Sequence, residues 1–108
     1  MRIFWEGNIM RKVFICSLCH KGILGGGLYL EPDTLTYKTN KLTVDPEYRN
    51  LVLPLKDIHQ VTWKWIIFPV ATFRMKNGEE YRFLIFNKNR FMKFYQEYRP
   101  DSELPVNM

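Results

Sequence analysis

The apolar residues of this chain change their period once, close to Asn87, and that change limits the folds that the chain can adopt. Upstream, apolar residues alternate with polar ones or run in short blocks, as they do in β-strands. Downstream, four aromatic residues stand at the spacing of one helical face: Phe91, Phe94, Tyr95 and Tyr98. This pattern predicts several strands and then one C-terminal helix, capped by Asn87 or Asn89 and ended by Pro100.

Asn77-Gly78 predicts a β-hairpin between two segments of strand character. Asn and Gly adopt positive φ at low cost, which a two-residue type I′ turn requires at both central positions. Each arm then has one apolar face, made by Phe73 and Met75 on the first arm and by Tyr81, Phe83 and Ile85 on the second.

Upstream of the hairpin we expect a first strand over 11–19, two strands over 28–38 joined at 31–34, and strands over 51–58 and 58–68. Pro54 should mark a strand end or a sheet edge, because proline cannot donate to the ladder. The glycine-rich stretch 21–27 is expected to be a flexible turn or bulge. It is not a P-loop, since the lysine and hydroxyl residue of that motif are missing.

Composition fits one domain spanning 1–108, with a folded core over about 11–98 and a frayed tail over 100–108. At 46% apolar residues the chain can fill a core without metal or disulfide. The sequence contains no membrane span and no signal peptide, so we expect a cytoplasmic protein. The net charge of +5 favours anionic partners.

The segment Cys16–His20 has the spacing C-x-x-C-H that is found in c-type haem attachment and in half of a zinc site. In a strand, however, positions three apart point to opposite faces, so the two thiols cannot act together. Zinc would also need further ligands, and His20 and His59 are the only histidines. We therefore predict no metal, no cofactor and no disulfide here, and the chain offers no catalytic constellation either.

The order of these elements resembles that of GRAM and bacterial pleckstrin-homology-like domains. The resemblance rests on Gly27-Leu28-Tyr29-Leu30, on Pro54-Leu55 before Asp57-Ile58, and on Asn77-Gly78 before Tyr81 and Phe83. It implies a mainly β fold with one C-terminal α-helix: a split β-barrel of about seven antiparallel strands, capped by the helix. It also implies a non-enzymatic module that binds lipid head groups, peptides or proteins.

The run Trp65-Ile66-Ile67-Phe68 is apolar on both faces of its strand. Such a run either enters the core completely or forms an exposed tip that docks on a bilayer or a partner. In the second case we expect Lys64, Arg74 and Lys76 to meet lipid phosphates around it.

Two functions remain open at this level. The first is weak binding to anionic lipid surfaces through basic loop residues, foremost Lys21, Lys38 and Lys41. The second is protein association, including self-association, through a sheet edge or the Trp65–Phe68 run. Nucleic acid is not an expected partner, because the charge excess is small and the aromatic residues are needed for the core.

Overall fold

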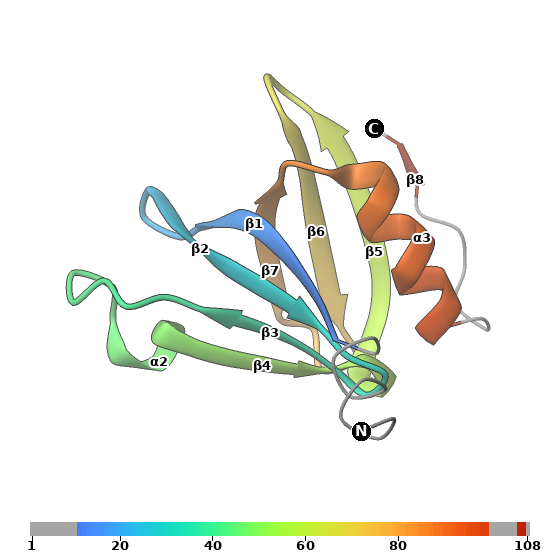
Figure 1. Ribbon diagram of the computed structural model, residues 1–108, viewed down its shortest axis with the longest axis horizontal. Helices are drawn as coiled ribbons and strands as arrows, with labels where there is room; N and C mark the ends of the chain where they lie inside the picture. Colours follow the sequence, from blue (N-terminus) through green and yellow to red (C-terminus); the bar gives the residue numbers. More distant parts are fainter. Residues whose placement is uncertain (1–10, 100–105, 108) are drawn as a thin grey trace, which may run out of the picture.

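Seven antiparallel strands form one continuous sheet in the computed structural model, which describes residues 11–99 and 106–107 (Figure 1). The strands are β1 (Lys12–Cys19), β2 (Ile23–Leu30), β3 (Thr34–Lys38), β4 (Asn50–Pro54), β5 (Ile58–Trp65), β6 (Pro69–Met75) and β7 (Glu80–Ile85). They lie in the order β4-β3-β2-β1-β7-β6-β5, and the short β8 (Val106–Asn107) adds to β5 in parallel. The remaining elements are α2 (Pro46–Arg49), the 3₁₀ turn η1 (Leu55–Asp57) and the C-terminal helix α3 (Lys88–Tyr98).

The sheet consists of two halves that diverge from a narrow seam (Figure 1). β1 pairs with β2 from Lys12 to Cys19, but it pairs with β7 only through Cys16–Leu18. Strands β4 and β5 follow each other through η1 without pairing, so the barrel is open along that side. The expected arrangement of about seven antiparallel strands and a C-terminal helix is confirmed.

Helix α3 packs its aromatic stripe into the space between the halves. Phe91 is fully buried, and its ring lies 5.1 Å from Phe14 of β1, 6.2 Å from Trp63 of β5 and 6.0 Å from Phe73 of β6. Asn87 caps the helix, because its side-chain oxygen accepts a hydrogen bond from the Arg90 N–H at 3.3 Å. The predicted stripe and cap are therefore confirmed.

Two prolines, Pro54 and Pro100, are predicted to mark the ends of elements, and the structure describes only the first of them. β4 ends at Pro54 and is also the edge of the sheet, so both expectations for that proline hold. Pro100 and most of the tail expected to fray over 100–108 lie outside the described residues.

None of the helices within 11–99 combines the length and the apolar character that crossing a bilayer requires.

The glycine-rich stretch is strand and not the flexible turn or bulge that the sequence suggested. The turn is confined to His20–Gly22, where Gly22 has a φ of 139°, and Gly25–Gly27 lie inside β2. The reason is a close approach, because a Cβ at Gly26 would stand 2.6 Å from the Lys38 carbonyl oxygen and 2.7 Å from the Tyr37 ring. The Tyr37 hydroxyl donates a hydrogen bond to the Leu24 carbonyl at 2.7 Å, which holds the ring over β2.

The β6–β7 hairpin exists, but its turn is not the expected two-residue type I′. Gly78 has a φ of 95° whereas Asn77 does not have a positive φ. The Gly78 N–H donates to the Met75 carbonyl and the Met75 N–H donates to the Glu79 carbonyl, which makes a three-residue loop. Asn77 supports this loop differently, since its side-chain oxygen accepts from the Glu79 N–H at 2.9 Å.

Replacing Gly26 by alanine should lower the free energy of unfolding by about 1–3 kcal/mol, because the new Cβ would collide with backbone and a packed ring. Gly25→Ala is the matched control. Its Cβ would meet only the flexible Lys41 amine at 3.5 Å, so stability should stay within about 1 kcal/mol of the parent. Urea unfolding measures the free energy of unfolding of both variants. Equal decreases in the two variants would contradict this account of the glycines.

Candidate binding surfaces

The β5–β6 hairpin carries an exposed apolar turn at the point where it extends beyond the rest of the sheet (Figure 1). Trp65 is 66% exposed, Ile66 63%, Ile67 76% and Phe68 45%. Trp63, two residues earlier on the same strand, is only 2% exposed. The run Trp65–Phe68 therefore lies outside the core, so the expectation that it enters the core completely is wrong and the run is exposed.

Two more exposed apolar side chains continue this turn across neighbouring elements. The ring of Phe68 lies 5.4 Å from that of Phe86, which follows β7 and is 49% exposed. The Phe86 N–H in turn donates to the carbonyl of Ile15 on β1, at 3.5 Å. We call Trp65, Ile66, Ile67, Phe68, Phe86 and Ile15 the apolar tip.

Sequence reasoning missed Phe86 and Ile15. A signal for Ile15 exists: it stands between Phe14 and Cys16, and adjacent residues of a strand point to opposite faces. If the core takes Phe14 and Cys16, the face with Ile15 must be exposed or covered by something else. Phe86 gave no comparable signal, because it lies where the strand ends and the helix has not begun.

Basic side chains lie on β5 next to the apolar tip and on helix α3, which follows Phe86. Lys64 precedes it on β5 and is exposed. Arg90 donates to the Val13 carbonyl at 3.0 Å and its guanidinium lies 4.5 Å from the Phe14 ring. Lys88 lies 5.2 Å from the Trp63 ring. The segments that build the tip and its surroundings, 11–30, 61–75 and 82–93, contain no acidic residue, so the local charge is positive.

Lys38 and Lys41 belong to the same outer face of the sheet as Ile15. Lys38 pairs with Gly27, and Gly27 pairs with Ile15, so the three lie in one row across β3, β2 and β1. Directly paired residues share a face of a sheet. The Lys41 amine reaches this face at Gly25, 3.5 Å from where a Cβ would stand. Lys21 lies apart in the β1–β2 turn, with a φ of 55°.

Arg74 and Lys76 are not close to Trp65–Phe68, and the expected grouping around Lys64 is wrong for these two. The tip adjoins Pro69 at the start of β6, whereas Arg74 is near the end of that strand. An extended strand advances about 3.3 Å per residue, which separates residues that are near neighbours in sequence. Arg74 instead pairs with Glu80 on β7, at 3.5 Å between Nε and Oε2.

The two thiols lie on opposite faces of β1, as predicted. Cys16 faces the core, and its burial raises the pKa to about 12. Cys19 is partly buried, and burial raises its pKa as well. Both are unbridged, and no group of metal-ligating side chains occurs among residues 11–99 and 106–107. The His20 ring instead contacts that of Tyr48 in a tilted arrangement, with ring centroids 4.2 Å apart, and its Nε2 lies 3.9 Å from an Asp45 oxygen.

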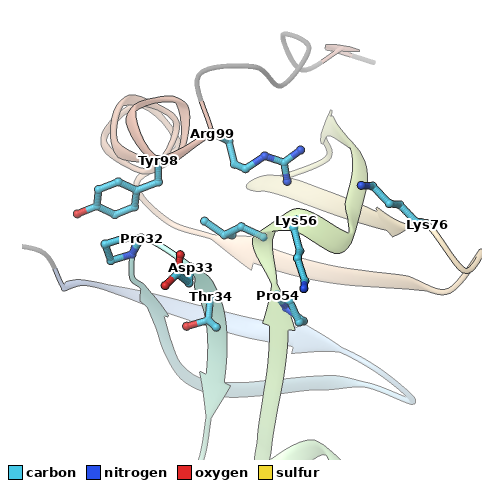
Figure 2. Close-up of a pocket in the computed structure, with 9 residues that line it drawn as sticks. Pro32, Asp33, Thr34, Pro54, Lys56, Lys76, Tyr98 and Arg99 are labelled. Atoms are coloured by element: carbon cyan, nitrogen blue, oxygen red, sulfur yellow. The ribbon is translucent and has the colours of Figure 1, made fainter.

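An open groove runs along the other end of the sheet. One part, of about 350 Å³, lies between β4 and the β6–β7 loop, with Val52 and Pro54 on one wall and Asn77 and Tyr81 on the other. It continues past Pro54 and Lys76 into a pocket of about 610 Å³ (Figure 2). No local pattern of residues indicates this groove, because its walls come from segments far apart in the sequence.

Comparison with known proteins identifies the fold. No family model matches the chain, so the likeness to GRAM domains rests on the sequence features alone. No curated protein matches it either. Among solved structures, the Spt16D Pob3N heterodimer contains a chain that superposes with a TM-score of 0.67 at 12% identity. The match covers 90% of this chain and 54% of the other, so this chain spans about half of its neighbour's length. The chain has the pleckstrin-homology-like fold, a split barrel closed by a C-terminal helix.

Proposed function

We propose that this chain is a non-enzymatic, GRAM-like binding module that docks on anionic membrane surfaces at the cytoplasmic side. The observation that carries the proposal is the apolar tip, an exposed cluster of large side chains at the end of a projecting hairpin. Monomeric proteins rarely expose such a cluster without a use for it.

The composition of the tip suits the interface between lipid and water. Trp65 and Phe68 are residue types that favour the level of the head groups and the adjoining chains, and Ile66 and Ile67 are purely apolar. Each isoleucine that passes from water into the bilayer would contribute on the order of 1–3 kcal/mol. A projecting turn can enter a fluid layer without any change in the sheet behind it.

Charge supports an anionic surface in particular. Lys64 directly precedes the tip, Arg90 bonds to Val13, two residues before Ile15, and Lys38 and Lys41 lie on the outer face that includes Ile15. A lysine or arginine close to an anionic surface contributes about 1 kcal/mol. Several of them on one face would orient the domain with its tip toward the lipid.

Protein association is the second candidate function. It is favoured by the same tip, which could insert into a pocket of a partner, and by the edge of β4, which pairs with no further strand in the described part of the chain. The structural neighbour is a heterodimer, which shows that this fold can occur in protein complexes. A protein partner for the tip would not require anionic lipid and would tolerate salt.

Vesicle co-sedimentation of a tip variant tests the membrane proposal. Ile67→Asp should reduce binding to phosphatidylserine-containing vesicles at least about tenfold, since a carboxylate would have to enter the lipid. Ile23→Asp is the matched control, because Ile23 is 68% exposed but lies outside the tip. Equal binding by the two variants would rule out the tip as the anchor. If even the parent chain binds no vesicle, weight moves to protein association.

Two double variants that have the same net charge as each other test the electrostatic contribution to membrane binding. Replacing Lys38 and Lys41 by alanine should weaken binding to anionic vesicles about tenfold and reduce its dependence on salt. Replacing Arg74 and Lys76 by alanine removes the same charge at the other end of β6, and binding should change little. A loss that is the same for both pairs would show that only net charge matters, which contradicts the proposed orientation.

A further inference from the structure

The open edge of β4 presents hydrogen-bonding groups that have no partner strand within the described residues. The Leu55 N–H donates to the Asp33 carbonyl, and the Thr39 N–H donates to the Arg49 carbonyl. In an antiparallel ladder these bonds recur at every second residue, so between them Leu51 and Leu53 bond to β3. The N–H and C=O groups of Asn50 and Val52 therefore point away from the sheet, and so does the carbonyl of Pro54.

This edge borders the groove described above, so an additional strand would have two walls to contact. Leu53 and Pro54 line the near wall, and Met75 and Tyr81 line the far wall. An extended segment seated there would direct every second side chain into the groove. Val52, which is 48% exposed and also lines the groove, would contact side chains of the added segment.

Beyond Pro54 the groove becomes electropositive. The larger pocket is lined by Lys56, Lys76 and Arg99 against one carboxylate, Asp33. Figure 2 shows the side chains of Arg99 and Lys76 extending from opposite sides toward the space above Lys56. The Arg99 Nη1 donates to the Ile58 carbonyl at 3.4 Å. Neither Lys56 nor Lys76 forms an ion pair with any residue of 11–99.

Two carboxylates, Asp57 and Glu79, line the narrower part of the groove. Glu79 already accepts hydrogen bonds from the Asn77 amide at 3.2 Å and from the Tyr81 hydroxyl at 3.1 Å. Asp57 lines only the narrower part, on the side of the β6–β7 loop. A ligand that follows the groove thus meets backbone donors and acceptors first, and cations at the end near α3.

We propose that β4 binds an extended peptide segment by antiparallel strand addition, with acidic residues preceding the paired part. β4 runs from Asn50 toward Pro54 and the pocket, so the N-terminal part of an antiparallel peptide reaches the cations. Asn50 and Val52 supply the donors, and at Pro54, which has no N–H, the pairing ends.

A second copy of the chain fits this site less well. Paired in the same antiparallel way, it would bring its own residues 46–49 to the pocket. These carry one acidic side chain, Glu47, and one basic, Arg49. They offer no net negative charge to Lys56 and Lys76, whereas an acidic peptide does.

The peptide site is independent of membrane docking, because the two surfaces lie at opposite ends of β6. The tip adjoins Pro69, and the groove is lined by Met75 and Lys76. A membrane-bound domain would keep the β4 edge accessible, and failure of either proposal would leave the other intact.

The test uses the full chain, labelled with ¹⁵N, and a synthetic peptide with an acidic run followed by alternating Val and Thr. Addition of peptide should shift the amide signals of Asn50 and Val52 and slow their hydrogen exchange. A peptide with lysine in place of the acidic run should bind at least about tenfold more weakly. If millimolar peptide leaves both amides unchanged, the proposal is wrong.

Modified peptides and charge variants sharpen the test without disturbing β4. N-methylation of the peptide groups that face β4 should abolish binding, while methylation of the alternate groups should not. Lys56→Glu with Lys76→Glu should weaken binding about tenfold, and Lys21→Glu with Lys41→Glu, an equal charge change outside the groove, should not. Insensitivity to the methylated positions would overturn strand addition. So would a dimer, seen by light scattering, in which Asn50 and Val52 are already protected.

Discussion

The packing of Phe91 is the interaction on which the rest of this structure depends. The backbone seam between the two halves of the sheet is short, since β1 pairs with β7 only through Cys16–Leu18. Phe91 contacts Phe14 from the first half and Trp63 and Phe73 from the second, and its ring stacks on Tyr95 at 5.7 Å. Helix α3 therefore supplies through side chains the cohesion that hydrogen bonds supply elsewhere. Burial of one such ring commonly stabilises a domain by several kcal/mol.

The core is filled by inward-facing residues that contact α3. Where a strand extends beyond the helix, its inward-facing side chains have nothing to pack against and are exposed. Trp63 is the last aromatic residue of β5 that reaches the helix, and Trp65 has the same orientation on the strand but lies beyond the core. The apolar tip forms because the β5–β6 hairpin extends beyond the core and because Phe86 and Ile15 adjoin it from two other elements. Nothing in the packing of the core requires large apolar side chains there, which is the reason for assigning them a binding role.

The two proposed surfaces divide the molecule by chemistry. At one end of β6, apolar side chains and nearby basic residues suit an anionic bilayer. At the other end, the β4 backbone groups that have no partner strand among the described residues, with the cations Lys56, Lys76 and Arg99, suit an extended acidic segment. Together they describe a module that would hold a protein segment at a membrane. Each part rests on its own observations.

Local signals in the sequence determined the elements: the Asn87 cap, the aromatic stripe with Phe91, the strand alternation and the edge position of Pro54 depend on neighbours a few residues apart. Tertiary structure decided what depends on partners far along the chain. Gly25–Gly27 form a strand because Tyr37 of β3 lies over Gly26, which the local sequence does not show. The distance between Arg74 and Trp65 depends on the pairing of β5 with β6, which places Arg74 at the far end of the strand. Exposure of the Trp65–Phe68 run and the groove beside β4 were settled in the same way. The physical reason is that periodicity records which side of an element is apolar, whereas register and packing decide what each side meets.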